Sequence, residues 1–316
     1  LAATGAVNVA APGAGFDISA SGDNQTIGSL SGVAGSTVSL GANTLILGGV
    51  SSSTFDGAIA GTGGLVKNGA GILTLGGANL FSGGVALNGG GLVVGNNAAL
   101  GSGALTVAGN GTLDANAAVT LANDVALGAG ANLDVLGSND LTLGGAISGA
   151  GGLIKDGPAT LTLTGASSYT GITTLNSGTL AVGAGGSLSG ASTVNLAGTG
   201  TLDISAGGNQ SIGGLAGVAG SAVALGGATL TTGGSNASTT FAGVLSGTGG
   251  LVQGGTGTLT LSGDNTYTGG TTVNGGSTLQ IGNGGSTGSV LGDITNSGSL
   301  VYNLGTTATV GGVVSG

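Results

Sequence analysis

The sequence predicts an all-β protein, a parallel β-solenoid in which short strands stack turn upon turn. Three observations predict it: 78 of the 316 residues are Gly, apolar residues alternate in short runs, and the chain repeats itself in tandem. Glycine at about a quarter of the positions disfavours helix, because each helical Gly costs about 1 kcal/mol relative to Ala. No stretch shows the sustained 3.6-residue period that an amphipathic helix requires.

Short apolar runs with a period of two mark the expected strands. They include 73–75, 85–87, 92–94, 105–107 and 119–121, and Gly, Asn, Asp and Ser fill the segments between them. Strands this short do not fit two-residue hairpins here, because the connecting segments vary and repeat as a set. We expect each strand to pair in parallel with its equivalent one coil away. Coils of roughly 20 residues, spaced about 4.8 Å apart, would number about 16.

Tandem repeats organise the chain. Residues 61–95, 149–183 and 247–282 align with one another, and a second match joins 16–41 to 202–226. No linker, charge run or change in composition separates these copies, so we predict one continuous solenoid over residues 1–316. Residues 1–10 match 188–197, and the closing residues 312–316 match 145–149, which places both ends of the sequence inside a repeat. We therefore expect a fragment of a longer array.

Three positions recur in every copy of the first repeat, and we interpret each as structural. A polar side chain ends the first strand, an aromatic side chain packs at a corner, and an Asn follows a later strand. The Asn is expected to adopt the left-handed backbone that a sharp corner needs. These residues are, in the same order, Lys67, Lys155 and Gln253, then Phe81, Tyr169 and Tyr267, then Asn88, Asn176 and Asn274.

Composition excludes most catalytic chemistry. The chain has no Cys, His, Met, Trp, Arg or Glu, and its only cations are Lys67 and Lys155. Thiol and histidine catalysis are therefore ruled out. The net charge of −9 disfavours nucleic acid and anionic membranes, and no apolar stretch is long enough for a membrane-spanning helix. We predict no catalytic residues, no cofactor and no metal.

A carbohydrate-active enzyme remains as the alternative, since parallel β-helices can host glycosidases. Hydrolysis would need two carboxyl groups about 5 to 9 Å apart, and Asp114 and Asp134 could stack on adjacent coils. Against this, Asp114 shares its local sequence with Asp17 and Asp203, which indicates a recurring structural position. Aligned aromatic residues lie several coils apart, so a carbohydrate-stacking platform is disfavoured. A single imperfect calcium-loop pattern at 12–19 and Thr runs such as 160–165 give no convincing calcium or ice site.

One resemblance follows from these motifs. The pattern GxGGL[VI]K, followed by GxLTLxGxxxYTGxTxxNxGxLxVG, resembles the autotransporter-associated β-strand repeat found in passenger segments of bacterial surface proteins. The match is strongest in the second and third copies, and Gln253 departs from the Lys of the pattern. The resemblance implies a right-handed parallel β-helix that is exported through a C-terminal outer-membrane barrel.

The resemblance also implies a location and a role. We expect a secreted or cell-surface, non-enzymatic passenger that forms a rigid stalk or filament for adhesion, cell aggregation or biofilm matrix. Its expected partners are further copies of itself, end to end or laterally, or a host or neighbouring cell surface. A passive carrier that displays an effector domain outside this segment is a second alternative.

Overall fold

The computed structural model describes residues 4–307 and 311–316, and within them the secondary structure consists entirely of short strands and turns. The predicted all-β solenoid is therefore confirmed, and no described helix is long and apolar enough to cross a bilayer. The chain groups into two compact units, Leu1–Gly152 and Leu153–Gly316. Residues 1–3, which took part in the terminal repeat match, lie outside the described residues.

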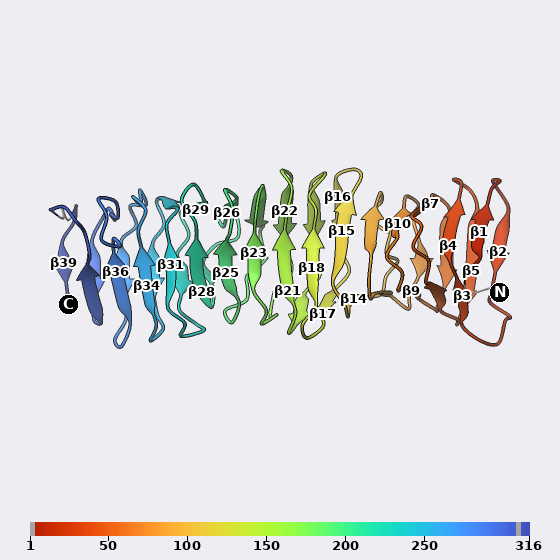
Figure 1. Cartoon of the computed structure of the whole chain (residues 1–316), viewed down its shortest axis with the longest axis horizontal. Coiled ribbons are helices and arrows are strands. Elements are labelled where there is room, and N and C mark those ends of the chain that lie inside the picture. Colours follow the sequence, from red (N-terminus) through yellow and green to blue (C-terminus); the bar gives the residue numbers. More distant parts are fainter. Residues whose placement is uncertain (1–3, 308–310) are drawn as a thin grey trace. The chain divides into compact units, whose positions relative to one another are not determined.

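Unit 1 is built from three strands per turn, and equivalent strands of successive turns lie side by side (Figure 1). Its first sheet consists of β1 (Ala6–Val9), β4 (Ser29–Gly32), β7 (Ser53–Phe55), β10 (Ile72–Leu75), β13 (Gly91–Val94), β15 (Gly111–Ala115) and β18 (Asn132–Val135). Its second consists of β2 (Gly15–Asp17), β5 (Thr37–Gly41), β8 (Ala58–Gly61) and β11 (Leu80–Phe81), followed by the pair β16 (Val119–Leu121) and β19 (Leu141–Leu143). Its third consists of β3 (Gln25–Ile27), β6 (Leu45–Leu47), β9 (Leu65–Lys67), β12 (Val85–Leu87), β14 (Leu105–Val107), β17 (Val125–Leu127) and β20 (Ile147–Gly149).

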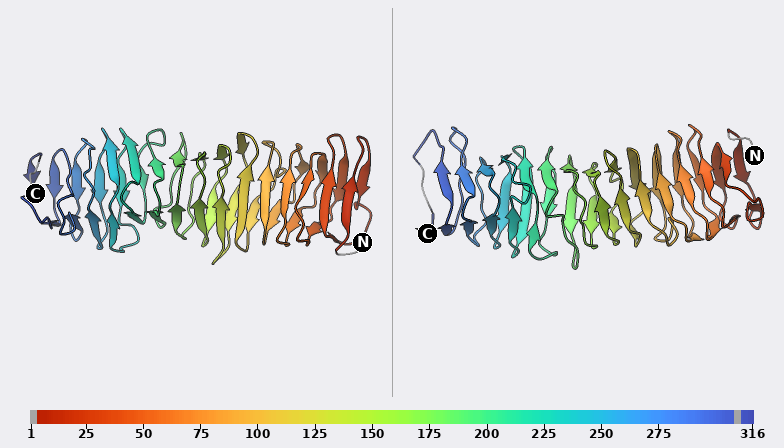
Figure 2. Two further views of the ribbon diagram at one scale, coloured as in Figure 1. Left: turned by 45° about the horizontal axis from the view of Figure 1, so that its top comes forward. Right: turned by 90° about the horizontal axis from the view of Figure 1, so that it is seen from below.

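Unit 2 follows the same plan, visible in the green and blue strands of Figure 2. Its first sheet consists of β21 (Gly152–Lys155), β23 (Thr173–Leu175), β25 (Thr193–Leu196), β28 (Gly214–Gly217), β31 (Thr239–Phe241), β34 (Thr258–Leu261), β36 (Thr278–Ile281) and β38 (Ser299–Tyr302). Its second consists of β22 (Thr160–Leu163), β24 (Thr179–Val182), β26 (Thr201–Asp203), β29 (Ala222–Gly226) and β32 (Val244–Gly247). Its third consists of β27 (Gln210–Ser211), β30 (Leu230–Thr232), β33 (Leu251–Gln253), β35 (Thr271–Val273), β37 (Ile294–Asn296) and β39 (Val314–Ser315).

Parallel pairing between successive turns sets the repeat length. Leu45 lies opposite Leu65, Leu65 opposite Val85, and Val85 opposite Leu105, so each of these turns takes 20 residues. Other turns are longer, as where Phe16 lies opposite Val38. The first sheets contribute one strand per turn, seven in unit 1 and eight in unit 2, which gives fifteen turns in the described chain. The expected number was about sixteen.

Aliphatic side chains fill the narrow core of each unit. Three-residue strands such as Leu65–Lys67 and Val85–Leu87 bury their first and third residues and turn the middle one outward. This alternation is the period-two pattern of the sequence, and it explains why Leu, Val and Ile suffice where aromatic residues are scarce.

Glycine makes room for the few large aromatic side chains. The ring of Phe55 is fully buried, and a Cβ built on Gly32 or Gly57 would lie 2.7 Å from a ring carbon. Phe241 is held in the same way by Gly217 and Gly243. These glycines are therefore required for close approach rather than for a special backbone angle.

Candidate functional site

The recurring lysines lie inside the solenoid. Lys67 ends β9 with 4 % of its surface exposed, and Lys155 ends β21 fully buried. The Lys155 ammonium donates to the carbonyl oxygens of Asp156 at 2.5 Å and Gly157 at 2.8 Å, and more weakly to Ser177 in the next turn at 3.4 Å. Backbone carbonyls that would otherwise point into the core thus receive a charged donor. The lysine position is a structural clamp between two turns.

Lys67 forms the corresponding clamp in the first copy. Its ammonium donates to the carbonyl oxygen of Gly69 and lies 3.5 Å from that of Gly89, one turn later. Burial lowers the pKa of Lys67 below its usual value, because desolvation penalises the charged form. In the third copy Gln253 takes this place and donates to the carbonyl oxygen of Gly257 at 2.9 Å, while its own carbonyl oxygen is buried without a hydrogen-bond partner.

The recurring asparagines of the first two copies bond through their side chains to residues of the preceding turn. The Asn88 amide donates to the side-chain oxygen of Asn68 at 2.7 Å, and the Asn176 amide donates to the Asp156 carboxylate at 2.7 Å. In the third copy the backbone N–H of Asn274 bonds to Gln253 at 3.0 Å.

The left-handed backbone expected at these asparagines is wrong. Positive φ occurs two residues later, at Gly90 (φ 70°), Gly178 (φ 68°) and Gly276 (φ 83°), and Asn236 is the single described non-glycine residue with positive φ. A Cβ at Gly178 would lie 2.4 Å from the Gly157 carbonyl oxygen and 2.9 Å from the Lys155 ammonium. Glycine is needed there for both the turn and the clamp, which leaves Asn free to stack.

The recurring aromatic residues are core residues. Phe81, Tyr169 and Tyr267 have no exposed surface, so none of them can stack on a carbohydrate. The Tyr169 hydroxyl lies 2.6 Å from that of Thr173, which lies 3.0 Å from that of Ser192. Ser192 donates in turn to the carbonyl oxygen of Gly171 at 2.6 Å. This chain of hydroxyls satisfies the buried phenol.

The third copy repeats the arrangement in a shorter form. The Tyr267 hydroxyl lies 2.5 Å from that of Thr271. Burial raises the pKa of both Tyr169 and Tyr267 to about 12, because a phenolate would lose its hydration. In the first copy, Phe81 has no hydroxyl to satisfy, and Val85 stands at the position of the two threonines.

A buried position two residues before each aromatic side chain was not foreseen. The Asn79 oxygen accepts from the backbone N–H of Ile59 at 2.8 Å, and its amide donates to the carbonyl of Ala99 at 2.6 Å, so it links three turns. Asn265 likewise accepts from Leu245 at 2.9 Å and donates to Ser289 at 2.9 Å. Ser167 stands at this position in the second copy, and its hydroxyl is buried without a partner. The recurrence of a short polar residue before an aromatic one was the available signal.

The two carboxylates of the enzyme alternative lie on neighbouring strands, β15 and β18. Asp134 pairs with Thr112, so Asp114 is its diagonal neighbour, about 7–8 Å away by the geometry of adjacent strands. Asp114 accepts hydrogen bonds from the backbone N–H groups of Ala115 and Ser138, at 2.9 and 3.0 Å, and from the Ser138 hydroxyl at 2.5 Å. These bonds fasten the turn around Ser138 to the preceding coil.

Two further aspartates show the recurring structural position. Asp17 and Asp203 accept from the backbone N–H groups of Ser19 and Ser205, at 2.8 and 2.9 Å. Hydrogen bonds from the Ser19 side chain and backbone lower the pKa of Asp17. Within residues 4–307 and 311–316, no group of three or more carboxylates is placed to hold a metal ion.

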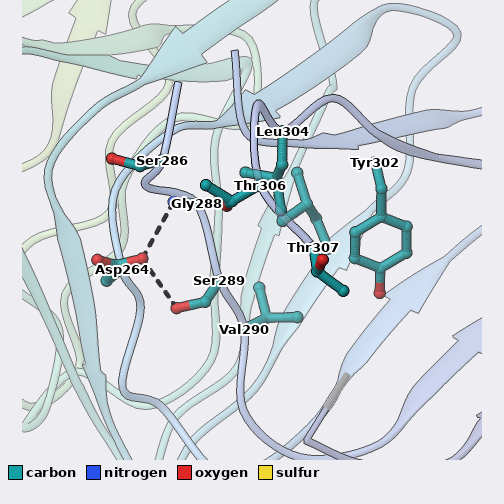
Figure 3. A pocket seen from close by; sticks show the side chains of 10 residues that line it. Asp264, Ser286, Gly288, Ser289, Val290, Tyr302, Leu304, Thr306 and Thr307 are labelled. Carbon is teal, nitrogen blue, oxygen red and sulfur yellow. Dashed lines mark hydrogen bonds between the residues drawn. The ribbon is translucent and has the colours of Figure 1, made fainter. Parts of the chain in front are cut away.

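A cavity of about 200 Å³ opens near the end of unit 2 (Figure 3). On one side the Asp264 carboxylate accepts from the Gly288 N–H at 3.0 Å and the Ser289 hydroxyl at 3.1 Å. On the other side lies Tyr302, which pairs in register with the buried Ile281. Tyr302 therefore takes the register position of a core residue on the last strand of this sheet, where 36 % of its surface stays exposed.

Comparison with known proteins agrees with the repeat pattern. The passenger-associated-transport-repeat family matches three times, at residues 65–94, 153–182 and 251–281. No curated protein and no solved structure matches the chain significantly. The matched segments contain the Lys or Gln at the clamp position, the buried aromatic residue and the recurring Asn of each copy. Three segments of the parallel β-solenoid thus match the passenger-associated-transport-repeat, in agreement with the resemblance to the repeat of autotransporter passengers.

Proposed function

We propose that this chain is a non-enzymatic part of an autotransporter passenger that forms a rigid stalk or filament at the cell surface, with a role in adhesion, cell aggregation or biofilm matrix. The observation that carries the proposal is the repeated clamp between turns inside the passenger repeats. Lys67, Lys155, Asn79 and Asn265 each hydrogen-bond to backbone groups of neighbouring turns. Such bonds resist separation of the turns, as a stalk requires.

Export fits the same composition. The chain has no Cys, so no disulfide can lock it before passage through an outer-membrane pore. It has two Lys and no Arg, and both lysines are buried, which removes cleavage sites for trypsin-like proteases outside the cell. The repeat family supports a secreted or surface-exposed location.

We propose further that the partner in aggregation is a second copy of the chain. Copies with a net charge of −9 repel one another unless they meet where carboxylates are lacking. The outward residues of the third sheet of unit 1 are uncharged in all seven turns: Thr26, Ile46, Val66, Ala86, Thr106, Ala126 and Ser148. By contrast, Asp17 lies on the second sheet, and Asp114 and Asp134 lie on the first.

Shortening the stalk tests the proposal. Deletion of residues 65–104 removes two complete turns, because Leu65 pairs with Val85 and Val85 with Leu105. The full-length protein lacking them should still reach the surface, with a stalk about 10 Å shorter.

Source cells lacking the gene should sediment more slowly than cells carrying it, and Ala86→Asp should reduce sedimentation without reducing surface display.

The alternatives predict different results. If sedimentation and adhesion are unchanged when the gene is removed, the stalk role in cell contact is wrong. If a passive carrier is the correct description, adhesion will follow the effector domain when that domain is moved to an unrelated stalk. If purified protein cleaves glycans and Asp114→Asn with Asp134→Asn abolishes the cleavage, the non-enzymatic proposal fails.

A further inference from the structure

A three-residue asparagine motif is present at the same repeat position in each unit. In unit 1 it is Asn24-Gln25-Thr26, within residues 16–41, and in unit 2 it is Asn209-Gln210-Ser211, within the matching residues 202–226. Both have the form Asn-X-Ser/Thr, the acceptor pattern for N-linked glycosylation. Each copy of this second repeat therefore holds one acceptor motif at the same place.

The two asparagines are held in the same way. The side-chain oxygen of Asn24 accepts from the backbone N–H of Thr44 at 2.8 Å, and that of Asn209 accepts from Thr229 at 2.8 Å. Both side chains are exposed, and neither amide nitrogen has a hydrogen-bond partner in the structure. With the oxygen fixed against the next turn, the amide nitrogen is the free, solvent-facing atom of the carboxamide.

The hydroxyl of the motif is retained although its residue changes. Thr26 of the first copy corresponds to Ser211 of the second. Neither hydroxyl forms a hydrogen bond that would explain why a hydroxyl is present in both copies. Four other outward hydroxyls of the same repeat disappear between the copies: Ser29, Ser31, Thr37 and Ser39 become Gly214, Ala216, Ala222 and Ala224. Ser36 and Ser221 are retained for a structural reason, since each donates to a backbone carbonyl at 2.7 Å. The hydroxyl at Thr26 and Ser211 is thus kept without a structural partner.

Buried asparagines provide the contrast. Asn79, Asn123 and Asn265 use their amide nitrogens in hydrogen bonds to backbone carbonyls. Their residues two positions later are Phe81, Val125 and Tyr267, so none of them forms an acceptor motif.

Two more exposed asparagines do form the motif, Asn110 before Thr112 and Asn236 before Ser238. Their side-chain oxygens are likewise fixed, by the N–H groups of Asn132 at 2.9 Å and Thr256 at 3.0 Å. In all four cases the motif coincides with an exposed carboxamide whose oxygen is bonded to the next turn.

We propose that Asn24 and Asn209 are N-linked glycosylation sites of the exported chain. A glycosyltransferase would join the Asn amide nitrogen to C1 of a sugar carried as a glycosyl diphosphate. The N–C1 bond forms as the bond from C1 to the diphosphate oxygen breaks, the amide nitrogen loses one proton to an enzyme base, and the diphosphate leaves with the electron pair. The bond to Thr44 or Thr229 uses the carboxamide oxygen, so the product keeps that contact. The inference is independent of the stalk proposal.

The test is peptide mass spectrometry of the full-length protein purified from the surface of its source cells. Peptides with Asn24 and Asn209 should carry a hexose or N-acetylhexosamine. The exposed Asn97, whose oxygen also accepts from the next turn, at Thr120, but which lacks the motif, should be unmodified. Thr26→Val should remove the sugar from Asn24 below detection, and Thr26→Ser should retain it.

Controls separate modification from folding. Asn24→Asp removes the acceptor nitrogen but keeps an oxygen for Thr44, as Asp124 and Asp293 do for Ala146 and Val313. This variant should reach the surface in unchanged amount and without sugar at residue 24. Unmodified Asn24 and Asn209 in surface-exposed wild-type protein would overturn the proposal, and so would modification that persists in Thr26→Val.

Discussion

In the first copy of the passenger repeat, residues 65–94, buried Phe81 is followed four residues later by Val85. In the second copy, residues 153–182, buried Tyr169 is followed at the same distance by Thr173, and their hydroxyls bond at 2.6 Å. The third copy agrees with the second, with Tyr267 bonded to Thr271. At this pair of positions the three copies preserve hydrogen-bond satisfaction rather than residue identity, because an unpaired buried hydroxyl is costly.

The tyrosine copies should lose stability at high pH. The pKa of Tyr169 and of Tyr267 rises to about 12 on folding, from 10.0. Their contribution to stability is fully present below pH 10 and is lost as the pH rises to about 12, since the unfolded chain ionises first. Each tyrosine should account for about 2 kcal/mol of the loss by pH 12.

Urea unfolding at pH 9 and pH 12 measures this effect. The double variant Tyr169→Phe, Tyr267→Phe is the control, because it retains every other titrating group. A wild-type loss between these pH values no greater than that of the double variant would contradict the assignment. The lowered pKa of Lys67 affects the stability only below about pH 10.5, and it affects the wild type and the double variant equally.

Removing the second clamp should be the most damaging single substitution. Lys155→Ala leaves the carbonyls of Asp156, Gly157 and Ser177 without their charged donor and opens a cavity, at a cost of about 4 kcal/mol. Lys155→Gln imitates the third copy and should cost less. The urea midpoints of the two variants give the order, and equal midpoints would show that a glutamine side chain at this position recovers none of the clamp.

The hydroxyl pairing can be transferred between copies. Phe81→Tyr alone buries a hydroxyl without a partner and should cost about 2 kcal/mol. Adding Val85→Thr should recover at least half of that loss, because it supplies the partner that Tyr169 has in Thr173. A double-mutant cycle in urea measures the coupling, and additive losses would mean that the first copy does not share the geometry of the second.

The repeat and its alternating strands were predictable from sequence, because inward Leu, Val and Ile leave a period-two pattern. The Tyr-Thr pairs were also visible as covariation at a spacing of four residues, once the copies were aligned. The burial of the lysines could not be predicted from sequence. The carbonyl groups that accept from Lys155 converge on it only when two turns pack together, and no sequence pattern marks them. Positive φ was assigned to Asn88 instead of Gly90, because both residues favour turns and only the packed clamp distinguishes them.

The smallest expected effect is a gain in the second copy. Ser167 replaces the linking Asn of the other copies, yet the Gly165 and Ser187 backbone groups around it bond to each other as Gly263 and Ser289 do around Asn265. An Asn at 167 should therefore donate to both carbonyls, as Asn265 does at 2.9 Å, and stabilise unit 2 by about 1 kcal/mol.

Hydrogen exchange at the Ser187 amide and the urea midpoint both measure the outcome of Ser167→Asn. Ser167→Ala is the matched control, and it should be neutral or slightly stabilising because the buried hydroxyl it removes has no partner. A loss of stability in Ser167→Asn would mean that the space around residue 167 is too small for an asparagine side chain. A higher urea midpoint together with slower hydrogen exchange at the Ser187 amide would show that the three copies share one backbone geometry around this position. The second copy would then lack only the side chain that links its turns.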